Sequence, residues 1–575
     1  MCGIYGITKR DPGFIRSYID SCSHRGPDGS DIWYDDHVTL GHNLLSITSE
    51  PEVGKQPWHT DKGNVLIYNG EIFNYDHVVW SYRNSGWIPK TTCDTELLAF
   101  LLDSFYVDIV NSNIIDSMHA YAYYDKEQKT ITLSRDHAGI KPLFYAETSD
   151  GLVFGSEIKG MIDKVPGARC IDEFASASMS YSGINISANT MFKGIKKVLP
   201  GQTLVYDIHK QKFTRTSRWV IKPTSKKGFD PEEFRQEVHE TVKMCTLGMR
   251  KFGVFLSGGL DSTMIAHELN KILPSVDSFT NEMNPNVIIG EDHNDDAKHA
   301  KWFADHYGFN HHPIQVTPET VKSCWDDSMF TMEQPVYNMS MPMYYHTNKV
   351  LSQHDVVVTM AGDMGDELLG GYPKYWKLKN NLPTSFEECV WRWMHRIKRP
   401  VQLSKKVDAK AIHGELCKII PQELWNPEDP INSYMAIDCI TQVPEEFFSR
   451  NDQFGMKFGM EGRFPLATQR FMKYCMDIHA DHKIGKDKSD TKLLSKIAYK
   501  GHMPDYIINK MKTGWTVPLI YWMGTNKDLD DFAMSYMNAD DCLKNTVSMD
   551  NWKNKKTRVI SWMMRSWAQR YSMTL

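Results

Sequence analysis

The pattern of apolar and polar positions is clearest in the middle of the chain. The apolar run 254–256 predicts a buried strand. It leads into Ser257-Gly258-Gly259, after which Ile265, Leu269 and Ile272 recur at a helical spacing. The pattern therefore predicts a strand, a glycine-rich turn and a helix in direct succession.

Similar signals flank this unit on both sides. We expect a helix from Asp230, a strand over 276–280, a helix over 295–307 that ends at Gly308, and another strand over 356–360. Strands that alternate with helices favour a parallel α/β sheet. Ligands of such sheets lie beyond the carboxyl ends of the strands. We therefore expect the loop after the strand at 254–256 and the loop after the strand at 356–360 to lie at the same edge of the sheet.

Length and composition indicate a globular protein of more than one domain. The chain has 575 residues, too many for one ordinary domain, and 41% of them are hydrophobic and 24% charged. The net charge of −5, with both signs mixed along the chain, argues against a nucleic-acid partner. No apolar run approaches the roughly 18 residues of a membrane-spanning helix, so no membrane association is expected.

The cysteines and the first residues suggest a cytoplasmic location. Eleven cysteines are dispersed without a C-x-x-C pair or a repeated spacing, which favours reduced thiols. The opening sequence MCGIYGITKRDPG has neither a basic segment nor a long apolar segment, so no signal peptide is expected.

The glycine-rich turn at 257–259 is suited to bind an anion. Its glycines let backbone N–H groups converge, and the start of the following helix adds partial positive charge. The motif has Asp261 where a Walker-type loop has its lysine. A carboxylate beside phosphates suggests a bridging Mg²⁺. The alternative is a tight turn in which Gly258 and Gly259 serve only packing.

The sequence SGGLDS at 257–262 resembles the pyrophosphate loop of the ATP-pyrophosphatase superfamily, as found in glutamine-hydrolysing asparagine synthetases. The resemblance implies that ATP is split between its α and β phosphates and that a carboxylic acid is activated as its adenylate. The ATP-binding residues that it implies are Phe255, Leu256, Ser257, Gly258, Gly259, Asp261, Ser262, Ala361, Gly362 and Lys512.

A second acidic loop, AGDMGDE at 361–367, follows the last predicted strand and resembles the second signature of the same family. The resemblance implies that Asp366 joins Asp261 on Mg²⁺ and pyrophosphate. It also implies that Asp363 faces the acyl-adenylate. A further family pattern, K-x-x-L-R, whose arginine is absent here, singles out Lys492, and the resemblance implies that this lysine neutralises the charge that develops in the reaction. A helix N-terminal cap would explain one of these acids but not all of them.

The N-terminal third begins with a candidate nucleophile. Cys2 follows the initiator Met directly, so removal of Met1 would leave a cysteine with a free α-amine. An α-amine has a pKa of about 7.7–8.0, which suits a base for the neighbouring thiol. This is the N-terminal-nucleophile arrangement, although an arbitrary cysteine at this position would usually have no such function.

Motifs that follow Cys2 occur in the order and spacing of a known family. They are CGI at 2–4, HRGPD at 24–28, NGE at 69–71 and DTE at 94–96. Together they resemble the class II glutamine amidotransferase domain, in which Cys2 attacks the side-chain amide of glutamine and releases ammonia. The resemblance implies an oxyanion hole formed by Asn69 and the Gly70 amide. It implies that Glu71 and Asp94 bind the α-ammonium group of glutamine.

One position departs from the family pattern. The family usually has an arginine, which clamps the carboxylate of glutamine, where this chain has Leu44 in GHNLLSI. Either another cation replaces it, with Arg25 and Lys55 as candidates by chain proximity, or glutamine binds weakly and free ammonia is used. Because the nucleophile and the oxyanion motif are intact, replacement is the working hypothesis.

The resemblance of the two sets of motifs implies an enzyme with two domains, one α+β and one α/β. Residues 1–220 are expected to form a glutaminase domain with the four-layer αββα fold of N-terminal-nucleophile hydrolases, and 221–229 a linker. Residues 230–575 are expected to form an ATP-pyrophosphatase domain with a parallel sheet and helical additions.

The resemblance implies a glutamine-dependent asparagine synthetase, which converts L-aspartate, L-glutamine and ATP to L-asparagine, L-glutamate, AMP and pyrophosphate. Relatives form dimers, so a homodimer is a further expectation. One alternative is an amidotransferase of the same family that acts on a different carboxylic acid. The other is a non-catalytic regulatory relative, which only Leu44 supports, whereas the intact Cys2, Asp261, Asp363 and Lys492 argue against it.

Overall fold

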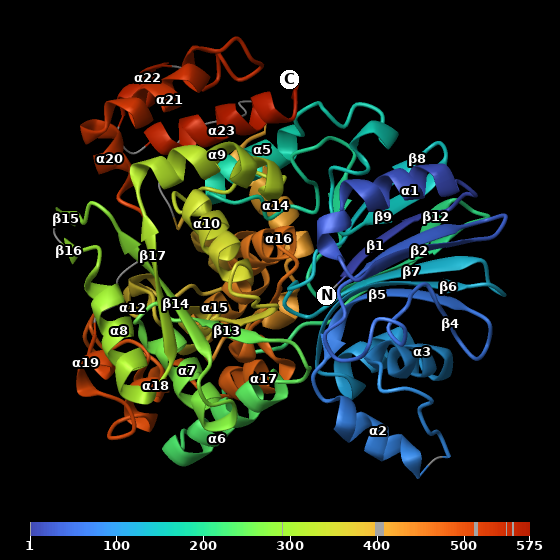
Figure 1. Cartoon of the computed structure of the whole chain (residues 1–575), viewed down its shortest axis with the longest axis horizontal. Coiled ribbons are helices and arrows are strands. Elements are labelled where there is room, and N and C mark those ends of the chain that lie inside the picture. Colours follow the sequence, from blue (N-terminus) through green and yellow to red (C-terminus); the bar gives the residue numbers. More distant parts are fainter. Residues whose placement is uncertain are drawn as a thin grey trace.

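The computed structural model shows two parts that pack side by side (Figure 1). The N-terminal part, blue to cyan, is built on antiparallel sheets, and the C-terminal part, green to red, on a parallel sheet. The predicted fold class is confirmed. The structure describes residues 2–84, 86–289, 291–396, 407–510, 516–547, 549–554 and 557–575.

Two six-stranded antiparallel sheets form the centre of the N-terminal part. Their strand orders are β10-β8-β9-β1-β3-β2 and β12-β11-β7-β6-β5-β4. The strands of the first sheet are β1 (Cys2–Ile7), β2 (Gly29–Tyr34), β3 (Thr39–Leu44), β8 (Phe144–Thr148), β9 (Gly151–Gly155) and β10 (Lys196–Lys197). Those of the second are β4 (Trp58–His59), β5 (Val65–Ile72), β6 (Ser117–Asp125), β7 (Thr130–Arg135), β11 (Gln202–Asp207) and β12 (Lys212–Arg218).

Helices cover the outer faces of both sheets, which gives the four layers of the predicted αββα fold. Helix α1 (Pro12–Ser21) packs on β1 and β3, and α3 (Asp94–Ser104) packs on β4 and β5 with α2 (Tyr75–Arg83) beside it (Figure 1). Apolar residues such as Ile4, Val65 and Ile67 fill the space between the sheets. Further helices are α4 (Val107–Ile109) and α5 (Glu173–Ser182).

A five-stranded parallel sheet of order β17-β14-β13-β18-β19 forms the centre of the C-terminal part. Its strands are β13 (Phe252–Phe255), β14 (Asp277–Met283), β17 (Asn310–Val316), β18 (Val358–Met360) and β19 (Glu461–Arg463). The helices before and between them include α6 (Pro231–Met244), α7 (Leu260–Ile272), α8 (Asp295–Tyr307), α9 (Pro318–Met332), α10 (Met341–Ser352) and α11 (Gly365–Leu369). The carboxyl ends of β13 and β18 therefore meet at one edge.

Helical additions surround this sheet. They are α12 (Pro373–Leu378), α13 (Phe386–Met394), α14 (Ala409–Ile419), α15 (Pro430–Ile440), α16 (Ser449–Lys457), α17 (Gln469–Asp477), α18 (Leu493–Ala498), α19 (Asp505–Ile508), α20 (Leu519–Thr525), α21 (Lys527–Asn538), α22 (Met549–Lys553) and α23 (Arg558–Arg570). The short strands β15 (Ile288–Ile289) and β16 (Glu291–Asp292) pair with each other. Helix α16 lies at the boundary between the two parts (Figure 1).

Several local signals place the elements as the sequence predicts. Asp230 caps α6, because its carboxylate accepts from the backbone N–H groups at the start of that helix. Helix α8 ends at Gly308, which has the left-handed φ of +77° expected of this position. The strand expected over 276–280 begins one residue later and extends to Met283, since all seven of its residues pair with β17.

Among the described residues, no helix is long and apolar enough to cross a membrane. The eleven cysteines of the sequence are all free thiols in the structure.

Candidate functional site

The glycine-rich turn between β13 and α7 has a conformation that its sequence requires. Gly258 has a φ of +77°, and a Cβ atom there would lie 2.1 Å from the backbone oxygen of Asp296. Inside the turn, the hydroxyl oxygens of Ser257 and Ser262 lie 2.9 Å apart, and the Ser262 hydroxyl donates to the Gly259 carbonyl at 3.1 Å. The turn therefore presents the start of the thirteen-residue helix α7 to the cavity beyond the sheet.

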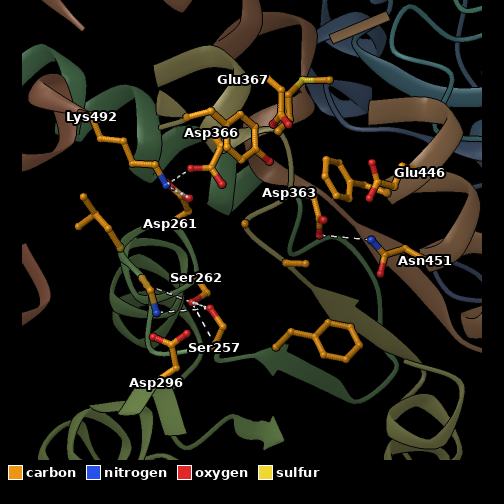
Figure 2. Close-up of a pocket in the computed structure, with 18 of the residues that line it drawn as sticks. Ser257, Asp261, Ser262, Asp296, Asp363, Asp366, Glu367, Glu446, Asn451 and Lys492 are labelled. Atoms are coloured by element: carbon orange, nitrogen blue, oxygen red, sulfur yellow. Dashed lines mark hydrogen bonds and ion pairs between the residues drawn. The ribbon is translucent and has the colours of Figure 1, made fainter. Parts of the chain in front are cut away.

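That cavity, of about 320 Å³, lies where the carboxyl ends of β13 and β18 meet (Figure 2). It brings together most of the residues that the sequence predicts for ATP and for catalysis. They are Phe255, Ser257, Gly259, Asp261, Ser262, Ala361, Gly362, Asp363, Asp366 and Lys492. Leu256 and Gly258 belong to the same turn but do not line the cavity, and Lys512 lies outside the described residues.

Lys492 joins the two acidic residues predicted for the metal. Its ammonium group forms ion pairs with Asp261 and with Asp366, the latter at 2.6 Å (Figure 2). All three side chains are at least 89% buried, so these contacts are poorly screened by solvent. One buried ammonium therefore partly neutralises two carboxylates that come from different loops.

Asp363 contacts two residues that sequence reasoning did not find. Asn451 donates to Asp363 Oδ2 at 3.2 Å, and Arg450 Nη2 lies 3.4 Å from Oδ1. The Arg450 guanidinium also stacks over the Tyr344 ring at 3.6 Å and lines the same cavity. Arg450 and Asn451 lie on α16, in a region without a recognisable motif, where a buried arginine cannot be distinguished from one that serves helical packing.

The donor set of this cavity suits Mg²⁺ held together with phosphates. Asp261 and Asp366 both reach the same lysine nitrogen, so their carboxylates converge on one region of the cavity wall. Within the described ranges, no group of three or more His, Cys, Asp or Glu side chains could hold a metal alone. Mg²⁺ commonly takes one or two carboxylates and completes its shell with phosphate oxygens and water.

Cys2 lies at the start of β1 beside the predicted oxyanion residues. Its backbone N–H donates to Asn69 Oδ1 at 3.0 Å, which fixes the orientation of the Asn69 amide. The Asn69 Nδ2 group is buried and has no hydrogen-bond partner among the described residues. A Cβ on Gly70 would lie 2.3 Å from the Met118 oxygen, so only glycine fits there. A buried donor and a close backbone amide are the parts an oxyanion hole needs.

A small cavity adjoins Cys2 and is lined by residues of four segments. They are Cys2, the loop Leu44 to Ser49 with Gly54 and Gln56, the segment with Tyr68, Gly70 and Glu71, and Cys93 to Thr95. No lysine, arginine or histidine is among these lining residues, all of which lie in the described part of the chain. The cavity therefore offers no cation to a carboxylate.

Neither cation proposed to replace the missing arginine lines this cavity. Arg25 is fully buried, where its guanidinium pairs with Glu157 at 3.1 Å and with Asp452 at 2.9 Å, and its Nε donates to the carbonyl of Cys2 at 3.3 Å. Lys55 is exposed and pairs with Glu52. Arg25 thus supports the backbone of Cys2 instead of the cavity wall.

The two acids of this cavity have raised pKa values. Burial raises the pKa of Asp94 to about 6. Burial and the nearby charge of Asp94 raise the pKa of the Glu71 carboxyl, and the guanidinium of Arg463, 3.2 Å from Glu71 Oε2, lowers it. Burial likewise raises the pKa of the Cys2 thiol, so the sulfur needs a base to become a nucleophile.

Two family models match the chain. The model for asparagine synthase matches residues 233–559, and the model for a glutamine amidotransferase domain matches residues 1–220.

Three relatives illustrate the similarity. Asparagine synthetase [glutamine-hydrolyzing] 3 of Bacillus subtilis is 25% identical, with 89% of this chain and 86% of the relative covered. Asparagine synthetase B [glutamine-hydrolyzing] of Escherichia coli is 25% identical, with 92% and 84% covered. Amidase chry2 of Gibberella zeae is 23% identical, with 90% and 87% covered.

Proposed function

Because this chain belongs to the asparagine synthase family, we propose that it makes L-asparagine from L-aspartate, L-glutamine and ATP, with two sites in one chain. The observation that carries the proposal is that one chain holds both a Cys2–Asn69 pair beside a small cavity and an Asp261–Lys492–Asp366 cluster beside a phosphate loop. One site would release ammonia, and the other would prepare its acceptor.

In the small cavity, the sulfur of Cys2 attacks the side-chain carbonyl of glutamine, a thioester forms and ammonia leaves. Water then hydrolyses the thioester to glutamate and regenerates the thiol. In this proposal Asn69 Oδ1 holds the nitrogen of Cys2, which becomes the basic α-amine once Met1 is removed. Asn69 Nδ2 and the Gly70 amide donate to the oxyanion, and Glu71 and Asp94 bind the α-ammonium group.

In the larger cavity, the carboxylate of aspartate attacks the α-phosphorus of ATP, and pyrophosphate leaves. Ammonia then attacks the acyl carbonyl of the adenylate, and AMP leaves. Lys492 stabilises the negative charge of the phosphates, and Asp363 takes the proton that the attacking nitrogen loses. Arg450 supplies a buried cation beside Asp363 and is the group we assign to the α-carboxylate of aspartate.

We include Mg²⁺ in this proposal, held by Asp261 and Asp366. When bound, the ion would neutralise charge on the phosphates of ATP. We also propose a cytoplasmic location, in keeping with eleven free cysteines, and a homodimer as the assembled form.

Pyrophosphate release in the presence of ATP and Mg²⁺ tests the function. A panel of carboxylic acids is supplied first with glutamine and then with ammonium. Release with aspartate and glutamine, with asparagine as the product, is the expected result. Release with aspartate and ammonium only would show that the small cavity does not supply ammonia.

A second candidate is the same chemistry on a different acid. The similarity to amidase chry2, at 23% identity, is close to the 25% for the two asparagine synthetases, so identity alone does not select aspartate. Pyrophosphate release with another acid of the panel, and none with aspartate, would establish this candidate.

Replacing Leu44 with arginine should tighten glutamine binding. An arginine here would give the cavity the cation it lacks, and a charge-assisted pair with a carboxylate contributes about 1.5–3 kcal/mol. We expect L44R to lower the KM for glutamine by about 10- to 100-fold. Glutaminamide, which has no carboxylate, is the internal control, because its KM should not fall. An equal effect on both substrates would contradict the argument.

Glutamine use should weaken as the pH falls through 6. The cavity needs Asp94 ionised to bind an ammonium group, and burial raises the pKa of Asp94 to about 6. Protonation at lower pH removes that charge, so the KM for glutamine should rise about tenfold between pH 8 and pH 5. Ammonium-dependent synthesis at fixed free ammonia serves as the comparison. A KM that is flat across this range would be inconsistent with a role of Asp94 in binding.

A further inference from the structure

Arg463 occupies the junction between the two parts of the molecule. It is the last residue of β19, at the edge of the parallel sheet, and its side chain is fully buried. Its backbone carbonyl accepts from the N–H of Ala361 at 3.3 Å, so the residue is fixed to the strand end that carries the acidic loop. Its side chain extends in the other direction, into the N-terminal part, where it meets Glu71.

The Arg463 guanidinium is held in one orientation by hydrogen bonds from all three of its nitrogens. Its Nε donates to Glu461 at 2.5 Å, and its Nη1 donates to the backbone carbonyls of Cys245 and Leu247. Its Nη2 donates to Glu71 Oε2 at 3.2 Å. Three of these four partners belong to the C-terminal part, so this part of the molecule fixes the orientation in which the guanidinium contacts Glu71.

The charges that act on Glu71 are those of the acids Asp94 and Glu461, of the N-terminus and of the Arg463 guanidinium, which is the one cationic side chain among them. Asp94 lies in the same cavity wall, and Glu461 accepts from Arg463 Nε and also raises the pKa of Glu71 by its charge. A carboxyl buried among acids without a cation takes up a proton, and a neutral carboxyl cannot bind an ammonium group by charge. No basic side chain lines the cavity itself within the described chain, so the required cation reaches Glu71 from outside the cavity.

We propose that Arg463 is a positioning residue through which the synthetase part completes the glutamine pocket, by fixing the carboxylate of Glu71 for the α-ammonium group of glutamine. The inference rests on the proposed function, since it assumes that Glu71 binds this group. It extends that function by making glutamine affinity a property of both parts of the chain. It assigns Arg463 no contact with glutamine, ATP or the acid.

The test is Arg463→Lys in the full chain. A lysine keeps the positive charge, but its single ammonium group cannot donate hydrogen bonds to Glu461, the two carbonyls and Glu71 at the same time. We expect R463K to raise the KM for glutamine by about tenfold while its kcat for glutamine hydrolysis changes little. Ammonium-dependent synthesis in the same preparation should stay within about twofold of the wild type.

Arg565→Lys is the matched control. Arg565 is also fully buried and also donates to backbone carbonyls, but it pairs with a single carboxylate, Asp541 at 2.7 Å, in the α23 region, whereas Arg463 pairs with two. R565K should leave the KM for glutamine unchanged. In the background E71Q, Arg463→Lys should cause no further rise, because the partner on which it acts is already neutral.

Two results would overturn the proposal. One is an R463K enzyme with wild-type KM for glutamine and intact ammonium-dependent synthesis. The other is a parallel loss of glutamine- and ammonium-dependent activity, which would show a purely structural role. Failure of the proposed function is distinguishable from both, because the wild type would then hydrolyse no glutamine at any concentration.

Discussion

Replacing Cys2 with alanine should abolish glutamine-dependent synthesis and leave ammonium-dependent synthesis intact. The sulfur is the only atom of the protein that forms a bond to glutamine in the proposed reaction. Losing a nucleophile that acts together with its base and oxyanion hole reduces turnover by about 10⁴- to 10⁶-fold. The measurement compares pyrophosphate and asparagine formation with glutamine against formation with ammonium, in the same preparation of C2A.

The selectivity of this effect follows from the distance in the chain and in the fold between the two sites. Cys2 lies in the antiparallel sheets, and the residues proposed to bind ATP lie at the carboxyl ends of the strands of the parallel sheet. Ammonium-dependent turnover should therefore remain within about twofold of the wild type. Cys170→Ala is the matched control, since this half-buried thiol lines neither cavity and should change neither activity. Hydrolysis of glutamine by C2A at more than a trace rate would refute the assignment of the nucleophile.

Replacing Lys492 with methionine should have the opposite selectivity. The variant removes the ammonium that contacts both Asp261 and Asp366 and that would stabilise the departing pyrophosphate. Loss of one such electrostatic contact typically lowers turnover by about 10²- to 10³-fold, and we expect the upper end because two carboxylates also lose their cation. Synthesis should fall to this extent with either nitrogen source.

Glutamine hydrolysis separates this prediction from simple unfolding. The K492M enzyme should still hydrolyse glutamine within a few-fold of the wild type, because no residue of the small cavity contacts Lys492. Lys483→Met is the matched control: Lys483 is equally buried, but it donates to Asn432 and lines neither cavity. We expect K483M to lower stability and to keep the rate of synthesis within a few-fold. Loss of both activities in K492M would mean that the lysine is needed for folding and would contradict a specific role in synthesis.

Local sequence signals predicted the strands and helices of the parallel sheet and the turn at Gly258, and the family resemblance predicted the fold of the N-terminal part. The turn at Gly258 needs a left-handed φ and a close backbone approach, so glycine marks it in the sequence. The end of α8 at Gly308 is specified in the same way. In such a turn the backbone conformation itself requires particular residues, which is why the turn could be located from a few residues.

Contacts between distant segments could be predicted only where the family resemblance names both residues, as for Asp261, Asp366 and Lys492. Arg450 and Asp363 are 87 positions apart in the chain, and Arg463 and Glu71 are 392 positions apart. Nothing in the sequence around Arg463 indicates that its side chain leaves its own sheet for the other part of the molecule. The proposal that Arg25 or Lys55 replaces the missing arginine used chain proximity, and the structure places neither in the cavity wall.

The buried pairs Arg25–Asp452 and Glu71–Arg463 have a consequence for how the N-terminal part folds while the chain is being synthesised. The ribosome completes the first partner of each pair hundreds of residues before the second. Until residues 452 and 463 emerge, Arg25 lacks one carboxylate and Glu71 lacks its guanidinium, so the N-terminal part must fold with these charges hydrated or neutralised. A fragment cut after the antiparallel sheets would remain in that unfinished state, and its catalytic properties would describe a folding intermediate and not the enzyme.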